Sequence, residues 1–355
     1  MTMDTLHTFT HALPKVELHC HLLGTVRRET FAALSQRQGW PVSAQEIASY
    51  YTRSEKPAGA IRVLRALDAV LIKQPDDLYL LVYEYLADAA EHNVHYAEFF
   101  WNPTGTARLS GIAYPQALAA IRRAIADALK DHAITGRMVA AIDREAEVSA
   151  AQEMVEWVIA HRCDEVVGIG MDYREEQRPP ELFVQPYATA RRAGLKTTAH
   201  AGEFGCPWNN VQAAIDLLQV DRVDHGYTVL DKPELTRRCV DRGIVFTVVP
   251  SNSYYRRTLA PERWALDHPI RHMPAAGLRV HPNSDDPTLH FINPTQVWAT
   301  MVQSFGFGLE DLRSFMLNGL DAAWIDDSTR RVWRADALAR FDTLRGLWPP
   351  ALQGV

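Results

Sequence analysis

The sequence has little of what marks secreted, disulfide-stabilised or membrane proteins. Cysteine occurs only four times in 355 residues, with no C-x-x-C pair, which is typical of free thiols in a reducing compartment rather than of a disulfide framework. No apolar run approaches the roughly 20 residues of a membrane span. The N-terminus also lacks the basic and apolar segments of a secretion signal. We therefore expect a cytoplasmic protein without a membrane partner.

Blocks of basic residues are absent as well. The 37 Lys and Arg residues are outnumbered by 43 Asp and Glu residues, which gives a formal net charge of -6. A chain of this charge does not favour the neutralisation of phosphates on which nucleic-acid binding depends. What the sequence does contain is 47% hydrophobic and 23% charged residues, enough for one large α/β domain or two ordinary ones. We expect a globular protein of enzyme size that binds a small molecule, and the oligomeric state stays open.

Eight short segments rich in β-branched and apolar residues recur along the chain, each followed by a helical pattern. Eight such β-then-α units predict a parallel (β/α)8 TIM barrel formed as a single domain by residues 1–355. The predicted strands are Val16–His21, Val94–Phe99, Arg137–Ile142, Val166–Gly170, Lys196–His200, Arg222–His225, Ile244–Val249 and Leu278–Asn283.

The predicted helices carry apolar residues at three- and four-residue spacing, as an amphipathic helix on a sheet requires. The connection after the first strand, residues 27–92, is far longer than a simple crossover and contains the mixed segment 50–59. We interpret it as extra helices that cover the barrel mouth, although a peripheral insertion fits the sequence equally well. Further helices are predicted at the C-terminus, over Thr295–Phe305, over Leu309–Asn318 and from Thr329 onward.

Histidine and aspartate gather at the ends of four predicted strands. His19 and His21 are two residues apart, which places both imidazoles on the same face of a strand. His200 ends the fifth strand, His225 ends the sixth, and an Asp-Asp pair follows the eighth. A single histidine at such a place is more often a core residue, and Asp-Asp-Pro is also a good helix N-cap. Several such residues on one rim of a barrel, however, indicate an active site.

Three imidazoles and a carboxylate are a ligand set that suits zinc and leaves a coordination position for water. Zinc can lower the pKa of a bound water from about 15.7 to about 7. Glu203, three residues beyond His200, could then pass a proton to a ring nitrogen of a substrate. The sequence therefore predicts a metal-dependent hydrolase.

Four motifs in order resemble the adenosine deaminase family within the amidohydrolase-type barrels. They are the segments 14–22 (PKVELHCHL), 200–203 (HAGE), 225–226 (HG) and 283–287 (NSDDP). The resemblance implies one catalytic zinc ion per subunit, held by His19, His21, His200 and Asp285. It also implies a proton donor to the purine N1 (Glu203), a residue that stabilises or deprotonates the attacking water (His225) and a residue that orients this water and binds the purine N7 (Asp286). The implied reaction converts a 6-aminopurine or its nucleoside to the 6-oxo purine and ammonia.

The sequence departs from that family pattern at residues expected to contact the substrate. Leu23 stands where the family usually has an acidic residue. A substrate hydroxyl buried against Leu23 would lack a hydrogen-bond partner, which would cost about 1–3 kcal/mol of binding free energy. After the fourth strand, the length of the segment 168–180 and its Pro-Pro ending resemble the adenine deaminase branch, and Tyr173 and Arg174 stand where small residues are more usual. Arg256-Arg257 follow the seventh strand. We expect substrate contacts from His21, Leu23, Tyr173, Arg174 and Asp286. The arginines Arg174, Arg256 and Arg257 indicate an aminopurine substrate with an anionic group. The simpler alternative is that they are solvated rim residues or pair with Glu175 and Glu176.

Two rival functions remain at this point. A binuclear amidohydrolase would typically carry a bridging lysine at the end of the fourth strand, and Val166–Asp172 contains none. A metal-dependent ligand sensor without turnover would not need Glu203 and Asp286, both of which are present. His268, His272, His281 and His290 match no motif, and we expect them to be solvated or to cap helices.

Overall fold

The computed structural model describes residues 2–40, 42–51, 63–349 and 352. Its eight strands form one sheet in the order in which they occur along the chain, and every observed strand overlaps the predicted one. The strands are β1 (Lys15–His21), β2 (Val94–Trp101), β3 (Thr135–Asp143), β4 (Val166–Asp172), β5 (Lys196–Ala201), β6 (Arg222–His225), β7 (Val245–Val248) and β8 (Arg279–Pro282).

The sheet closes into a barrel through the residues that follow β8. All seven neighbouring pairs are parallel, and Cys20 of β1 forms a parallel bridge with Asp285. The amide of His21 donates to Asp285 O at 2.8 Å, and the amide of Asp285 donates to His19 O at 3.0 Å. These two bonds place Asp285 directly beside the two histidines of β1. The predicted (β/α)8 barrel is confirmed.

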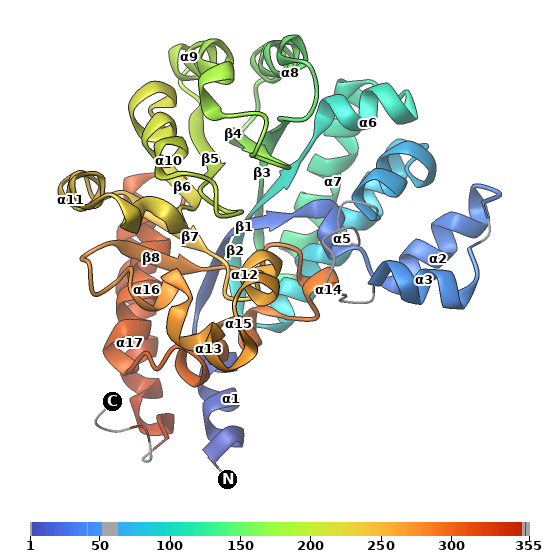
Figure 1. The fold of residues 1–355 in the computed structure, drawn as a ribbon. Coiled ribbons are helices and arrows are strands. Elements are labelled where there is room, and N and C mark those ends of the chain that lie inside the picture. The colour runs from blue at the N-terminus through green and yellow to red at the C-terminus, as the bar shows by residue number, and fades with distance from the viewer. Residues whose placement is uncertain (1, 41, 52–62, 350–351, 353–355) are drawn as a thin grey trace.

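Amphipathic helices surround the strands (Figure 1). The apolar residues at three- and four-residue spacing over 78–86 are all buried, whereas those over 118–129 end with Leu129, which is 50% exposed. Among the helices of the described residues, none is both long and apolar enough to cross a membrane. The crossover helices are α5 (Pro75–Glu91), α6 (Pro103–Ser110), α7 (Tyr114–His132), α8 (Val148–Ala160), α9 (Val184–Arg192), α10 (Trp208–Ala213), α11 (Pro233–Asp241), α12 (Ser253–Thr258) and α13 (Pro261–Asp267).

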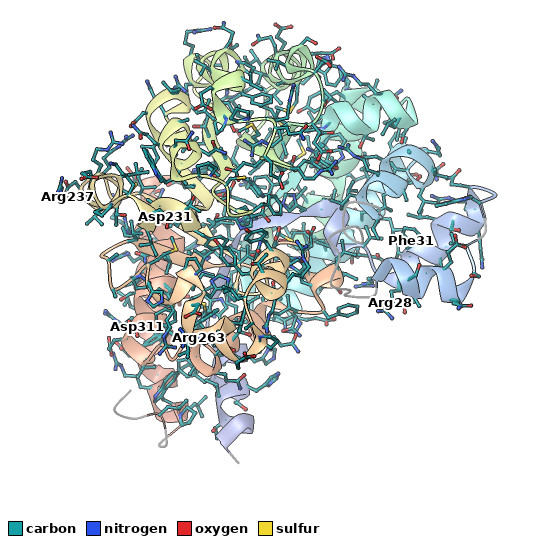
Figure 2. The ribbon with its side chains drawn as sticks, in the orientation of Figure 1. Arg28, Phe31, Asp231, Arg237, Arg263 and Asp311 are labelled. Carbon is teal, nitrogen blue, oxygen red and sulfur yellow. The ribbon has the colours of Figure 1, made fainter. Side chains whose placement is uncertain are left out.

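The predicted insertion contributes α2 (Arg28–Arg37) and α3 (Ala44–Tyr51), which stand outside the ring of helices (Figure 1). Figure 2 shows Arg28 and Phe31 on this outlying part. Most of the mixed segment 50–59 lies outside the described residues. Past it, Leu64 lines the cavity at the barrel mouth; that the insertion as a whole covers the mouth stays a prediction.

The C-terminal part forms α14 (Pro287–His290), α15 (Pro294–Gln303), α16 (Leu309–Ala322) and α17 (Asp327–Leu344), so the predicted C-terminal helices are present. At the opposite end of the chain, α1 (Thr2–Ala12) packs against α17, and the rings of Phe9 and Phe341 meet edge to face at 5.9 Å. Both termini therefore lie together at the lower end of the molecule in Figure 1.

Candidate metal centre and active site

Three imidazole rings and one carboxylate converge at the carboxyl end of the barrel. Nε2 of His19 and Nε2 of His21 each lie 3.1 Å from Nε2 of His200. Asp285 Oδ1 lies 3.5 Å from His19 Nε2 and 3.2 Å from His21 Nε2. Four ligands placed tetrahedrally about 2.0–2.1 Å from a zinc ion are roughly 3.3 Å apart. The separations match that value, so the predicted ligands fit a single zinc ion.

The outer nitrogen of each of these rings meets an acceptor, which keeps a proton on Nδ1 and aims the lone pair of Nε2 at the centre. Burial alone would raise the pKa of the Asp224 carboxyl, but the contact with His200 Nδ1 and the nearby imidazoles lower it below its usual range. Asp224 therefore stays ionised as an acceptor. The contacts are His21 Nδ1 to Asp172 Oδ2 at 3.3 Å, His200 Nδ1 to Asp224 Oδ2 at 3.3 Å, and His19 Nδ1 to Thr247 O at 3.1 Å.

Glu203 lies beside this centre with its carboxyl group almost completely buried. Its Oε1 accepts a hydrogen bond from Asn252 Nδ2 at 3.0 Å, and its Oε2 lies 3.5 Å from His225 Nε2. Burial, followed by the charges of Asp285 and Glu175, raises the pKa of Glu203 well above its usual value. A bound dication would offset the charge of Asp285 but not the burial. The geometry therefore favours a protonated Glu203 that can act as an acid.

His225 has a defined tautomer because of its neighbour Tyr227. The hydroxyl of Tyr227 donates to Val249 O at 3.2 Å and accepts from the amide of Val249 at 3.0 Å. Its single proton is thus in use, so the contact of 3.3 Å with His225 Nδ1 requires the proton to be on that nitrogen. Burial and the imidazoles of His19 and His200 lower the pKa of His225. His225 is therefore neutral, with an unprotonated Nε2 that can accept a proton.

Asp286 lies against the backbone of Gly24, with a carboxylate oxygen within 4.8 Å of one of Asp285. A Cβ atom built on Gly24 would lie 1.8 Å from Asp286 Oδ1, so only glycine fits there. Asp286 occupies the N-cap position of α14 with Pro287 following, yet its side chain caps no amide. Within the described residues, its buried Oδ1 has no hydrogen-bond partner, which is typical of a group that binds a ligand. Burial and the charge of Asp285 raise the pKa of Asp286 to about 7.

The backbone is strained at the carboxyl ends of three strands around the centre. Tyr173 after β4, His225 in β6 and Asp285 after β8 have φ values of 66°, 65° and 66°. A non-glycine residue in this left-handed region costs about 1–3 kcal/mol. Such strain persists where the surrounding contacts hold it, and here it turns the side chains of the rim toward the cavity. Tyr173 is held in addition by the guanidinium of Arg65, 4.1 Å from its ring centre.

A cavity of about 700 Å³, including its open mouth, lies over these residues. Of the predicted substrate contacts, His21, Tyr173, Arg174 and Asp286 line it. Leu23 does not appear in this lining among the described residues; it is 4% exposed and belongs to the hydrophobic core. The cavity would therefore not bring a ligand onto the side chain of Leu23 in this conformation.

The three arginines predicted near the substrate differ in their surroundings. Arg174 lines the cavity but pairs with Glu145, rather than with Glu175 or Glu176. Arg256 stacks on Trp264, with its guanidinium carbon 3.4 Å from the ring centre. Arg257 lines the cavity and donates from Nε to Ser253 O at 3.1 Å; among the described residues no carboxylate pairs with it.

Two of the unassigned histidines were predicted wrongly. His290, expected to be solvated or capping, is 5% exposed and lines the cavity, held between the hydroxyls of Ser251 and Ser253 at 3.2 and 3.3 Å. His281 is completely buried and bridges Phe315 O and Val16 O. The prediction is confirmed for His268, whose Nδ1 accepts the amide of Ile270 at a helix N-terminus, and for the exposed His272.

Several residues that shape the site have no signal in a single motif. Asp172 and Asp224 could have been found, since they lie at strand ends like the ligands that they orient. Glu175, Asn252 and His290 reach the site only through contacts between loops that are distant in the sequence. Glu17 could be predicted only in part: its spacing from His19 and His21 on β1 is visible in the sequence, but the hydrogen bond that it accepts from the amide of Ser284 at 2.9 Å is not.

Comparison with known proteins identifies the family. The family model described as adenosine deaminase matches residues 14–337. An adenine deaminase of Vibrio parahaemolyticus is 32% identical over 93% of this chain and 96% of its own length. Among solved structures, an amidohydrolase from Burkholderia ambifaria with bound zinc is 58% identical, with a TM-score of 0.95 over 96% of this chain and 94% of its own. The adenine deaminase of Arthrobacter aurescens is 27% identical, with a TM-score of 0.83 over 92% and 98% of the two chains. The chain belongs to the adenosine deaminase family.

Proposed function

We propose that this protein is a zinc-dependent deaminase that hydrolyses a 6-aminopurine to the 6-oxo purine and ammonia. The observation that carries the proposal is the convergence of His19, His21, His200 and Asp285 at distances that fit zinc, beside a buried acid and a neutral imidazole. Zinc held there would acidify a water molecule at neutral pH. The likeness to a zinc-bound amidohydrolase and to adenine deaminases supports the same assignment.

Each remaining residue of the site has one task in this proposal. His225 takes a proton from the water at its free Nε2. Glu203 gives a proton to the purine N1, so that the N1–C6 double bond becomes a single bond as the C6–O bond forms. The proton that His225 took from the water then passes to the exocyclic amine, and the C6–N6 bond breaks to release ammonia. Asp286 binds the purine N7 with the oxygen that has no partner among the described residues. Because His225 and Glu203 are held in opposite protonation states by their surroundings, the base and the acid are both ready at neutral pH.

Within this proposal, the free base adenine is the preferred substrate over adenosine. Leu23 is apolar and buried in the core, so it cannot accept a hydrogen bond from a sugar hydroxyl. The cavity wall instead includes the apolar side chains of Leu64 and Phe204. The four unpaired cysteines agree with the reducing, cytoplasmic compartment that we propose for the protein.

A second candidate substrate is an aminopurine with a carboxylate or phosphate group. Arg257 favours it, since this guanidinium lines the cavity with no carboxylate partner in the described part of the chain, and arginine binds such anions in a bidentate manner. The neighbouring Arg256, stacked on Trp264, provides a matched control.

Steady-state ammonia release from adenine, adenosine, AMP and a carboxylate-bearing aminopurine tests both candidates. The primary proposal predicts that Glu203→Gln abolishes turnover while the zinc content stays at one ion per subunit; a variant with wild-type turnover would exclude Glu203 as the proton donor. The anionic candidate predicts that Arg257→Gln lowers kcat/KM about tenfold for anionic substrates only, and that Arg256→Gln does not. An equal loss for neutral and anionic substrates would exclude it.

A further inference from the structure

A buried carboxylate outside the catalytic set, that of Glu175, holds the loop that carries the proton donor. Its Oε1 accepts hydrogen bonds from the amide of Gly202 and from Asn210 Nδ2, both at 2.7 Å. Its Oε2 accepts the amide of Glu203 at 3.1 Å. The side chain is 1% exposed, and N–H donors alone supply these bonds. Such an arrangement fixes the orientation of the carboxylate.

The two backbone bonds fix a tightly constrained turn. Gly202 has φ 69°, and a Cβ atom there would lie 2.5 Å from Thr228 Oγ1, so the turn has little room to shift. From this turn, held at both amides by Glu175, the side chain of Glu203 extends to the catalytic groups. There Asn252 holds its Oε1 at 3.0 Å, and Oε2 reaches His225. Glu203 is therefore fixed at its backbone by one residue and at its carboxyl by another.

Glu175 comes from a different part of the rim from the loop that it holds. It lies in the segment after β4, two residues beyond Tyr173, whereas Gly202 and Glu203 follow β5. Tyr173 and Arg174 of the same segment line the cavity. The contact thus couples the segment that meets the substrate to the loop that supplies the proton.

We propose that Glu175 is a positioning residue that sets the place of Glu203 for proton transfer, an inference that rests on the proposed deaminase function. Among the described residues, Glu175 itself neither lines the cavity nor belongs to the group of zinc ligands; it acts on the site through the backbone of Glu203. Its loss should affect the chemical step rather than the binding of zinc or substrate.

Glu175→Gln tests this proposal, because it keeps the shape of the side chain and turns one acceptor oxygen into an amide donor that faces an N–H group. We expect kcat to fall about 10- to 100-fold, as displacement of a catalytic group does, with KM within about twofold and one zinc ion retained. Glu176→Gln, at the exposed neighbouring position, should leave kcat unchanged. A Glu175→Gln enzyme with wild-type kcat would overturn the proposal. So would one that loses zinc and whose KM rises by the same factor as its kcat falls.

Amide hydrogen exchange separates this proposal from the proposed function. Glu175→Gln should speed exchange in the peptide that spans residues 201–205 whether or not aminopurines are substrates, and unchanged exchange there would contradict the inference. Absence of ammonia release by the wild-type enzyme would count against the function alone. Should Glu175→Gln fail to fold, Asn210→Ala removes one of the three donors and should lower kcat several-fold at constant KM; an unchanged kcat in that variant would also overturn the proposal.

Discussion

Replacement of Asp224 by asparagine should weaken zinc binding without unfolding the barrel. Asp224 contacts no metal position itself, but its Oδ2 lies 3.3 Å from His200 Nδ1 and its Oδ1 accepts from Thr247 Oγ1 at 2.7 Å. Asparagine has the same volume and can still present one oxygen to His200 and its amide group to Thr247. The charge is lost, so His200 keeps its tautomer but becomes a poorer ligand.

Loss of a partner that orients a metal ligand typically lowers metal affinity about 10- to 100-fold, which corresponds to about 1.4–2.8 kcal/mol. The dissociation constant of zinc can be measured at pH 7 by competition with a chromophoric chelator. Asp241→Asn, at an exposed position at the end of α11, is the matched control and should bind zinc as the wild type does. Wild-type affinity in Asp224→Asn would refute the orientation of His200 by this carboxylate.

Three further predictions concern residues around the centre. Gly24→Ala places a methyl group 1.8 Å from Asp286 Oδ1, so KM for the aminopurine should rise about tenfold with zinc retained. Gly346→Ala, whose methyl group meets nothing within 4 Å, is the control. An unchanged KM in Gly24→Ala would contradict the role of Asp286. Tyr227→Phe removes the acceptor of His225 Nδ1 and should lower kcat about tenfold at constant KM; wild-type kcat would argue against the assigned tautomer. Asp68 is fully buried behind the rim, where its Oδ1 accepts a hydrogen bond from Thr106 Oγ1 at 2.7 Å. Burial raises the pKa of Asp68 from 3.8 to about 7, so the wild type loses up to about 4 kcal/mol of unfolding free energy as the pH rises from about 4 through about 7. Asp68→Asn should therefore gain stability over the wild type between pH 5 and 8 in thermal denaturation, and a constant difference would show that Asp68 titrates normally.

The eight strands could be predicted from the sequence because each is a short apolar run followed by a helical pattern, which is a local property. The zinc ligands could be predicted for a related reason. In a parallel barrel every strand end reaches the same rim, so histidines and aspartates at strand ends must meet. The barrel therefore brings four residues that are far apart in the sequence together at one rim: His19, His21, His200 and Asp285.

The remaining parts of the site depend on contacts that no local pattern encodes. Glu175 was predicted only as a possible partner of the arginines, whereas it binds the amides of Gly202 and Glu203. His290 was expected to be solvated or capping because it matches no motif, yet the short α14 turns it into the cavity. Glu175 and His290 both lie in segments that follow strand ends, where strained backbone and hydrogen bonds across the rim set the direction of the chain. Side-chain direction in such loops cannot be derived from periodicity.

The central claim is that a single zinc ion in this site supports hydrolysis of a 6-aminopurine. Ammonia and 6-oxo purine should be measured together, with adenine as substrate, for the zinc-loaded protein, for the protein stripped by a chelator, and after zinc is restored. The account predicts one ammonia per 6-oxo purine, loss of both products on stripping and their return with about one zinc ion per subunit. A fully zinc-loaded protein that releases no ammonia from adenine, adenosine or their anionic derivatives would contradict it.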